Sequence, residues 1–122
     1  MDRQMILFPR ALAKNPATNP RALERLVRSD DPRVVGLVAL NPSTPGAALR
    51  RLAGRSDERV RALVAGNPST PADVLTALAS DRNADVRLAV ASNTAAPSAA
   101  LESLLSQPFG ASGPSEAMCA AV

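Results

Sequence analysis

The hydrophobic positions of this chain recur every 26 residues, without a gap, up to about residue 106. Within one unit the apolar residues lie three or four positions apart, as on one face of a helix, and they never alternate as in a strand. The pattern therefore predicts repeated helices rather than a sheet. Five apolar columns carry it: Leu23, Leu49, Leu75, Leu101; Leu26, Leu52, Leu78, Leu104; Phe8, Val34, Val60, Val86; Leu12, Val38, Val64, Val90; and Ala13, Ala39, Ala65, Ala91.

A further column contains only asparagine, and two of its members begin the pentapeptide NPSTP, at 41–45 and 67–71. The proline that follows the asparagine disfavours helix in the residue before it. Thr44 and Thr70 precede the second proline, where a hydroxyl can act as an N-cap and proline suits the first helical position. We expect the pentapeptide to be a corner between two helices, with the asparagine side chain bonded to backbone in a ladder from unit to unit. The column consists of Asn15, Asn41, Asn67 and Asn93.

These boundaries predict eight helices, two in each unit. One helix pair could not bury its apolar faces alone, so stacked units must share a continuous core. The predicted architecture is an all-α solenoid of about four 26-residue helix pairs. The helices are expected near 5–14, 20–28, 31–40, 45–54, 57–66, 71–80, 84–92 and 97–106, and nearly complete burial is expected for Leu49, Leu52, Leu75, Leu78, Val60, Val64, Val86 and Val90.

The period divides the chain into a helical repeat domain at 1–106 and a C-terminal tail at 107–122. Gly, Pro, Ser and Ala dominate the tail, which is typical of a flexible segment. We expect Phe109 to fold back onto Leu104 or Leu105 as a cover for the last repeat. At the other end, Met5, Ile6 and Leu7 are expected to close the core.

The unit A-x-N-P-S-T-P-x-x-x-L-x-x-L-A, followed by D-x-x-V-R-x-L-V-A, resembles the leucine-rich repeat variant family of bacteria over residues 5–106. The resemblance implies a right-handed superhelix of alternating α- and 3₁₀-helices, without the strand of ordinary leucine-rich repeats. The last unit departs from the pattern at 93–97, where its corner is expected to be weaker. Some members of the family carry a cysteine-rich iron–sulfur segment, but the matching cysteines are missing here, so no cluster is carried over.

The composition argues against catalysis and metal binding. The chain has no His and a single cysteine, Cys119, which removes the commonest general base and any thiolate metal site or internal disulfide. Its serines lie in corners or in the tail, and no pair of carboxylates recurs in a pocket-forming column. We therefore expect no enzymatic activity, no cofactor and no metal. With neither a signal peptide nor a membrane span in sight, a cytoplasmic protein is expected, and the abundance of Arg and Ala is typical of a GC-rich bacterium.

The net charge of +3 is unevenly distributed: residues 1–61 carry 12 basic against 6 acidic groups (+6), and residues 62–122 carry 2 against 5 (−3). Three arginine pairs lie one repeat apart, and three further arginines lie near them. We predict that this Arg-rich face binds an acidic protein or peptide, and no metal or membrane. The predicted residues are the pairs Arg25 and Arg51, Arg33 and Arg59, Arg61 and Arg87, together with Arg28, Arg50 and Arg55.

Three alternatives remain open for the basic face and the tail. The arginines could form an ordinary solvated face, with Asp57 pairing with Arg61, Glu24 with Arg28, and Asp30 with Arg33. They could also bind nucleic acid or phosphate, although no Tyr or Trp is available to stack bases. Thirdly, the chain could be a carrier or precursor that presents its Cys119-bearing tail to a modifying enzyme. The final Cys-Ala-Ala-Val fits the prenylation pattern only formally, because no polybasic run precedes it.

Overall fold

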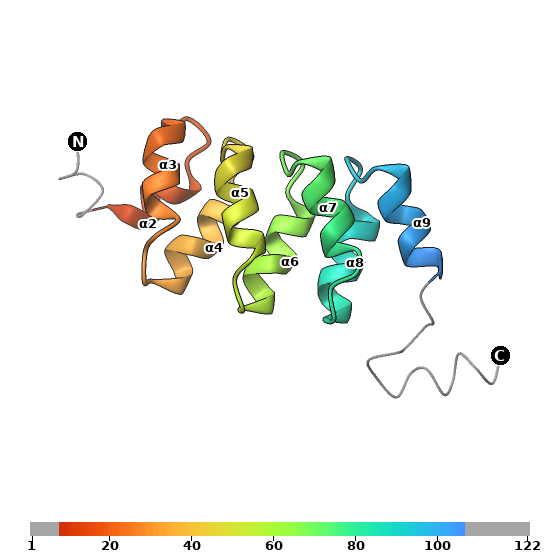
Figure 1. Ribbon diagram of the computed structural model, residues 1–122. Coiled ribbons are helices and arrows are strands. Elements are labelled where there is room, and N and C mark those ends of the chain that lie inside the picture. The colour runs from red at the N-terminus through yellow and green to blue at the C-terminus, as the bar shows by residue number, and fades with distance from the viewer. Residues whose placement is uncertain (1–7, 107–122) are drawn as a thin grey trace.

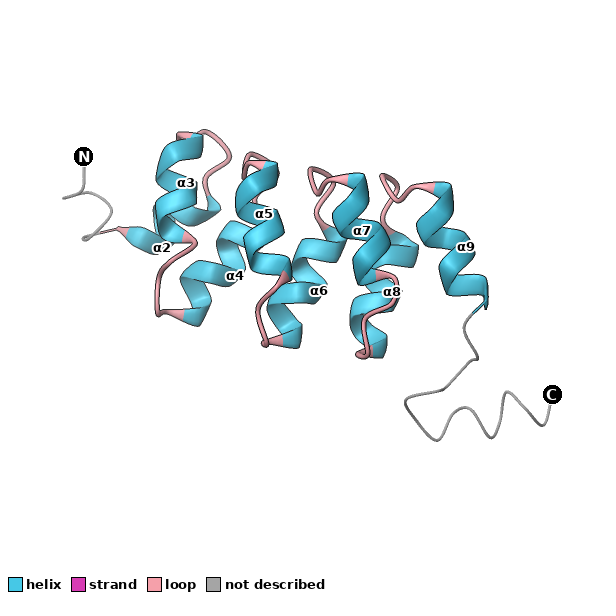
Figure 2. Cartoon of the chain, in the orientation of Figure 1, coloured by secondary structure: helices cyan, strands magenta, loops and turns pink. Residues whose placement is uncertain are grey.

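The computed structural model describes residues 8–106, and this part of the chain consists of eight α-helices joined by short loops, with no strand (Figures 1 and 2). The expected closure by residues 5–7, the tail at 107–122 and the contact of Phe109 lie outside the described residues. The helices are α2 (Pro9–Lys14), α3 (Pro20–Leu26), α4 (Pro32–Leu40), α5 (Gly46–Ala53), α6 (Glu58–Gly66), α7 (Ala72–Leu78), α8 (Ala84–Ser92) and α9 (Ser98–Ser106).

The helices alternate between two layers of an elongated stack. Helices α3, α5, α7 and α9 stand side by side in the layer that we name the first-helix layer (Figure 1). Helices α2, α4, α6 and α8 form the second-helix layer, in which neighbouring repeats make the more extensive contacts. The predicted all-α solenoid is thus confirmed. The predicted helix bounds agree within two residues, apart from the first helix, which is expected from residue 5 but begins at Pro9 with the non-helical Phe8 before it.

All eight helices are α-helices, so the alternation with 3₁₀-helices that the family resemblance implied is not seen as separate elements in residues 8–106. Hydrogen bonds of the 3₁₀ type, from residue i to i−3, occur instead at helix ends, as from Gly54 N to Arg51 O and from Ser80 N to Ala77 O. A tightened last turn satisfies carbonyls that have no partner within the helix.

The core follows the predicted columns. The eight leucines and valines expected inside are at most 4% exposed. Columns lose burial only at the ends of the described stack: Phe8 is 58% exposed, whereas Val34 and Val86 of its column are 0% exposed. Leu101 is 39% exposed, whereas Leu75 is 0% exposed. A repeat buries its side chains between two neighbours, and among the described residues the first and last repeats each have one neighbour.

The asparagine ladder is present as predicted. The side-chain amide of Asn67 donates to Ala39 O at 2.7 Å and to Asn41 O at 2.9 Å in the preceding unit. Its Oδ1 accepts from Ser69 N at 2.8 Å, so one side chain closes its own corner and satisfies two carbonyls of the previous corner. Asn41 and Asn93 make the equivalent bonds, and Asn41 and Asn67 are each 2% exposed. The ladder therefore binds each repeat to the one before it through backbone groups that would otherwise be buried without partners.

The role predicted for the corner threonines is wrong. Thr44 Oγ1 donates to Val38 O at 2.7 Å, and Thr70 Oγ1 donates to Val64 O at 2.6 Å, so each hydroxyl closes the C-terminal end of the preceding helix. Helix α5 has Pro45 as its N-cap, without a side-chain cap. A hydroxyl can donate as well as accept, and here the unpaired carbonyl at the helix end takes the donor. The last unit has Ala95 and Ala96 in place of the corner Ser and Thr, so it keeps the asparagine bonds and lacks the hydroxyls.

Helices α4, α6 and α8 each begin with a side-chain N-cap. Asp31, Asp57 and Asn83 each accept a hydrogen bond from the backbone N–H two residues later. In the first unit Asn19 caps α3 in the same way through Arg21 N, at 2.8 Å.

Replacing Leu75 by Ala should destabilise the protein by about 2–5 kcal/mol, because the side chain is fully buried between two repeats and its removal leaves a cavity. Leu101→Ala is the matched control in the same column, and it should cost less than about 1.5 kcal/mol because part of that side chain is already exposed. Urea unfolding followed by circular dichroism measures the two losses. Equal losses would show that the inward face has been assigned wrongly.

Asn67→Ala should cost about 2–4 kcal/mol, since it leaves the carbonyls of Ala39 and Asn41 short of a buried donor. Asn15→Ala serves as the control, because Asn15 is exposed and its side chain accepts from Ala17 N within its own corner. The same unfolding measurement applies. A loss for Asn67→Ala no larger than that for Asn15→Ala would contradict a stabilising ladder.

Candidate interaction surfaces

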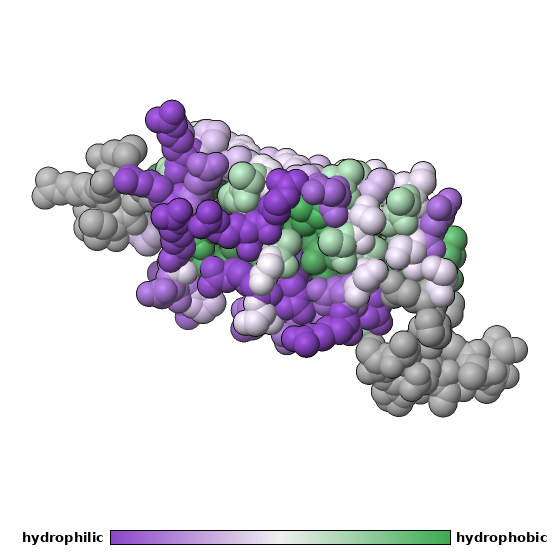
Figure 3. All heavy atoms as spheres, in the orientation of Figure 1, coloured by the Kyte–Doolittle hydropathy of each residue, from purple (hydrophilic) through white to green (hydrophobic). Residues whose placement is uncertain are grey.

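Four arginines gather on the first-helix layer near the N-terminal end of the stack, and we name Arg21, Arg25, Arg28 and Arg51 the arginine cluster. Arg21 and Arg25 lie on α3, Arg28 follows the end of that helix, and all three line a hollow of about 470 Å³ with Glu24. A smaller hollow of about 160 Å³ between α3 and α5 is lined by Glu24, Arg28 and Arg51. Four positive groups thus surround one carboxylate, which gives the cluster and Glu24 a net charge of 4 − 1 = +3. Hydrophilic side chains dominate this end of the molecular surface in Figure 3.

Two further predicted arginines of the same layer join neighbouring repeats. Arg50 Nη2 lies 2.9 Å from both carboxylate oxygens of Asp73 on α7, and its hydrogen bonds lower the pKa of that carboxyl. The pair is largely exposed, so it adds little stability, but it neutralises Arg50. Arg55 Nη1 donates to Val27 O at 3.3 Å, where a positive charge meets the C-terminal end of α3. Neither residue enlarges the arginine cluster.

Arg33 and Arg59 lie in the other layer, where they line a groove between α4 and α6. Asp57 Oδ1 accepts from Arg59 N at 2.9 Å and lies 3.9 Å from Arg59 Nε. The nine arginines predicted from the sequence therefore do not share one face. Five belong to the first-helix layer or to the loops that follow its helices: Arg25, Arg28, Arg50, Arg51 and Arg55. The other four belong to the second-helix layer: Arg33, Arg59, Arg61 and Arg87.

Arg61 is a buried member of the predicted set. Its Nε lies 2.7 Å from Asp81 Oδ2 and its Nη2 3.2 Å from Asp81 Oδ1, while Nη1 donates to Arg55 O and Ser56 O. Each side chain of this ion pair is 9% exposed. The guanidinium thus joins helix α6, the loop before it and the end of α7, and its carboxylate partner is Asp81 rather than the expected Asp57.

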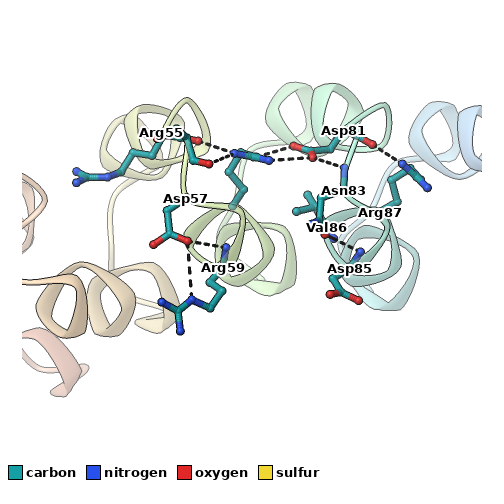
Figure 4. A network of polar contacts seen from close by, with 10 residues as sticks. Arg55, Asp57, Arg59, Asp81, Asn83, Asp85, Val86 and Arg87 are labelled. Carbon is teal, nitrogen blue, oxygen red and sulfur yellow. Dashed lines mark hydrogen bonds and ion pairs between the residues drawn. The ribbon is translucent and has the colours of Figure 1, made fainter. Parts of the chain in front are cut away.

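Arg87 is the next member of the same column and contacts backbone in the same way. Its Nη1 donates to Asp81 O at 2.6 Å, six residues earlier, as Arg61 Nη1 donates to Arg55 O six residues earlier. The column thus fastens the loop before a second-layer helix to that helix, in two successive repeats (Figure 4). Arg61 and Arg87 serve the fold through these bonds.

The Arg61–Asp81 pair stays ionised near neutral pH. Burial by itself would raise the pKa of Asp81, but the hydrogen bonds from Arg61 and from Asn83 N outweigh burial and hold the pKa below its ordinary 3.8. The hydrogen bond to Asp81 in turn raises the pKa of the Arg61 guanidinium, against the opposing effect of burial. Each of the two charges is therefore neutralised by the other within the fold.

The described residues contain no group of three His, Cys, Asp or Glu side chains that could hold a metal ion. Within the same range, no helix combines the length and the apolar character needed to span a membrane.

The two layers, the shared core and the ladder define a helical repeat domain, a class of protein whose extended surfaces commonly bind other proteins. Residues 35–94 match the family model of the Leucine Rich Repeat Variant domain, which confirms the resemblance for the central part of the stack. The fold and this match indicate a protein-interaction scaffold, and repeat domains of this kind are typically non-catalytic. Neither the curated proteins nor the solved structures include a significant match to the chain.

Two features of these surfaces do not follow from the repeat pattern. Arg21 belongs to the arginine cluster, but its column continues as Ala47 and Asp73, so it forms no arginine pair one repeat apart. Its spacing of four from Arg25 was the available signal. The Arg61–Asp81 pair was missed because 20 residues separate its members, which matches neither a helical spacing nor the repeat.

Asp81→Asn should destabilise the protein near neutral pH by leaving the buried Arg61 charge without its anion. The pKa of Asp81 is lowered by folding, so its stabilising contribution is complete above the unfolded value and is lost as the pH falls through the folded value. The difference in unfolding free energy between wild type and Asp81→Asn should therefore shrink below the ordinary pKa of 3.8. Thermal unfolding at a series of pH values measures this difference, and a difference that grows towards acid pH would contradict the assigned sign.

Proposed function

We propose that this chain is a non-enzymatic protein-interaction module whose arginine cluster binds an acidic segment of a partner protein. The observation that carries the proposal is the shared hollow between α3 and α5. Arg28 and Arg51 line it from adjacent repeats, and both side chains are exposed. Guanidinium groups bind carboxylates through paired hydrogen bonds, so two arginines beside one hollow suit consecutive acidic residues of a peptide.

Four other predicted arginines support this choice by their contacts within the fold. Arg50 is neutralised by Asp73, and Arg55, Arg61 and Arg87 donate to backbone carbonyls. Among the residues that line the two hollows of the cluster, four are positively charged and one, Glu24, is negatively charged.

Binding of nucleic acid is the competing function. Phosphates would be attracted by the same arginines, and affinity would then fall steeply as salt is raised. The sequence offers no Tyr or Trp and only two Phe for stacking with bases, which favours a protein partner. A bacterial origin and a cytoplasmic location remain predictions from the sequence, as does a flexible tail with Cys119.

The test compares wild type with the double variant Arg28→Glu, Arg51→Glu. Fluorescence anisotropy measures the affinity of each for a fluorescein-labelled peptide rich in Glu and Asp, and for a labelled DNA duplex. The double variant should bind the acidic peptide at least about tenfold more weakly, because two attractive charges become repulsive. Circular dichroism checks that the helices remain.

Arg10→Glu with Lys14→Glu is the matched control, since it makes the same change in net charge at exposed positions of α2. This control should change peptide affinity by less than about threefold. If both double variants lost the same peptide affinity, the binding would depend on net charge in general and not on the arginine cluster. Tighter binding of the duplex than of the peptide, with a steep loss between about 50 and 200 mM salt, would favour the nucleic-acid function.

A further inference from the structure

The second-helix layer contains two grooves that are related by the 26-residue repeat. The first groove, of about 380 Å³, is lined from α4 by Pro32, Arg33 and Gly36 and from the α6 side by Asp57, Arg59, Val60 and Leu63. The second groove, of about 350 Å³, is lined by Glu58, Arg59, Ala62 and Leu63 of α6 and by Asn83 and Asp85 beside α8. Adding 26 to the numbers of the first set gives five lining positions of the second.

The groove floor is apolar and its central column is small. Gly36 and Ala62 occupy equivalent positions, and Leu63 lines both grooves from the ridge between them. Leu88, the next member of the Gly36 column, is 64% exposed. The column thus leaves space beside α4 and α6 and ends in an exposed apolar side chain on α8.

The charge at the mouth of the groove changes sign from one repeat to the next. Arg33 and Arg59 stand at the first groove with the single carboxylate Asp57. At the second groove Arg59 stands with two carboxylates, Glu58 and Asp85. Figure 4 shows Arg59 and Asp85 extending from the same side of α6 and α8. A ligand that crosses both grooves would therefore meet positive and then negative charge.

We infer that this surface binds an extended peptide segment of a partner protein, with an acidic residue over the first groove and a basic residue over the second. Packed helices lie roughly 8–10 Å apart, which sets the distance between the two grooves. An extended chain of the polyproline type advances about 9 Å in three residues and then presents the same side again. The segment therefore places an acidic residue and a basic residue three positions apart, with an apolar side chain beside each.

This surface lies on the layer opposite the arginine cluster, so the inference stands or falls independently of the proposed function. The double variant Arg28→Glu, Arg51→Glu should leave affinity for such a segment within about twofold of wild type.

The experiment uses the full chain and four labelled proline-rich probes. In three of them the two charged positions lie three residues apart and are Glu and Lys, Glu and Glu, or Lys and Lys. Isothermal titration calorimetry or anisotropy gives the affinities. Wild type should bind the Glu–Lys probe about tenfold more tightly than either of the others. The fourth probe, with Glu and Lys adjacent, should bind as weakly as the like-charged probes. Equal affinity for all four probes, or no binding, would overturn the inference.

Asp85→Arg provides the charge swap, because it gives α8 the residue that Arg33 and Arg59 supply in the two earlier repeats. This variant should prefer the Glu–Glu probe over the Glu–Lys probe, an inversion that loss of folding cannot produce. An unchanged preference would contradict the assigned position of the basic residue.

Ala62→Leu fills the second groove with the side chain that the next repeat carries at Leu88, and it should weaken binding of the Glu–Lys probe about tenfold. Gly66→Leu is the control: it lies on the same helix and outside both grooves, a Cβ there meets nothing within 4 Å, and Leu40 occupies the equivalent position one repeat earlier. Equal effects of the two substitutions would place the probe elsewhere.

Discussion

The asparagine ladder is the interaction on which the rest of the structure depends. Every corner brings backbone carbonyls into the interior, and a solenoid of short helices has many such corners in a small volume. Asn41, Asn67 and Asn93 each resolve this problem with a single side chain, which binds the carbonyls of the previous corner and an amide of its own. Because the corners are fixed, the Leu and Val side chains of equivalent positions pack against those of the neighbouring repeats and form a continuous core.

Most of the fold could be predicted because equivalent positions of successive repeats can be compared within the one sequence. A single helix pair contains too few apolar residues to define an inward face, but Leu23, Leu49 and Leu75 in one column define it. The exceptions have physical causes. The threonine hydroxyl can either donate or accept, and the sequence does not say which backbone group is nearer. Exposure of Phe8 and Leu101 follows from their place at the ends of the described stack, which a column cannot reveal.

The candidate surfaces were less predictable, because charged side chains bind across the repeat rather than along it. Arg50 and Arg61 find their carboxylates on other helices, 23 and 20 residues away. Neither distance is a helical spacing or the repeat length, so composition and periodicity place these arginines on a helix without showing whether they are available. Burial separates Arg61 from exposed arginines such as Arg28 and Arg51, and burial is a property of three-dimensional packing.

The bonds of each asparagine reach back by one unit and no further. At each junction between two units, which we call a seam, the later unit supplies the asparagine amide donor and the earlier unit supplies the backbone carbonyl acceptors. Duplication or loss of one whole 26-residue unit would join matching seams, whereas insertion of a single residue within a unit would change the spacing across one seam and move the next asparagine off its carbonyls. The corner thus lets such a protein change length during evolution in whole units, while the charges on its outer positions diverge separately.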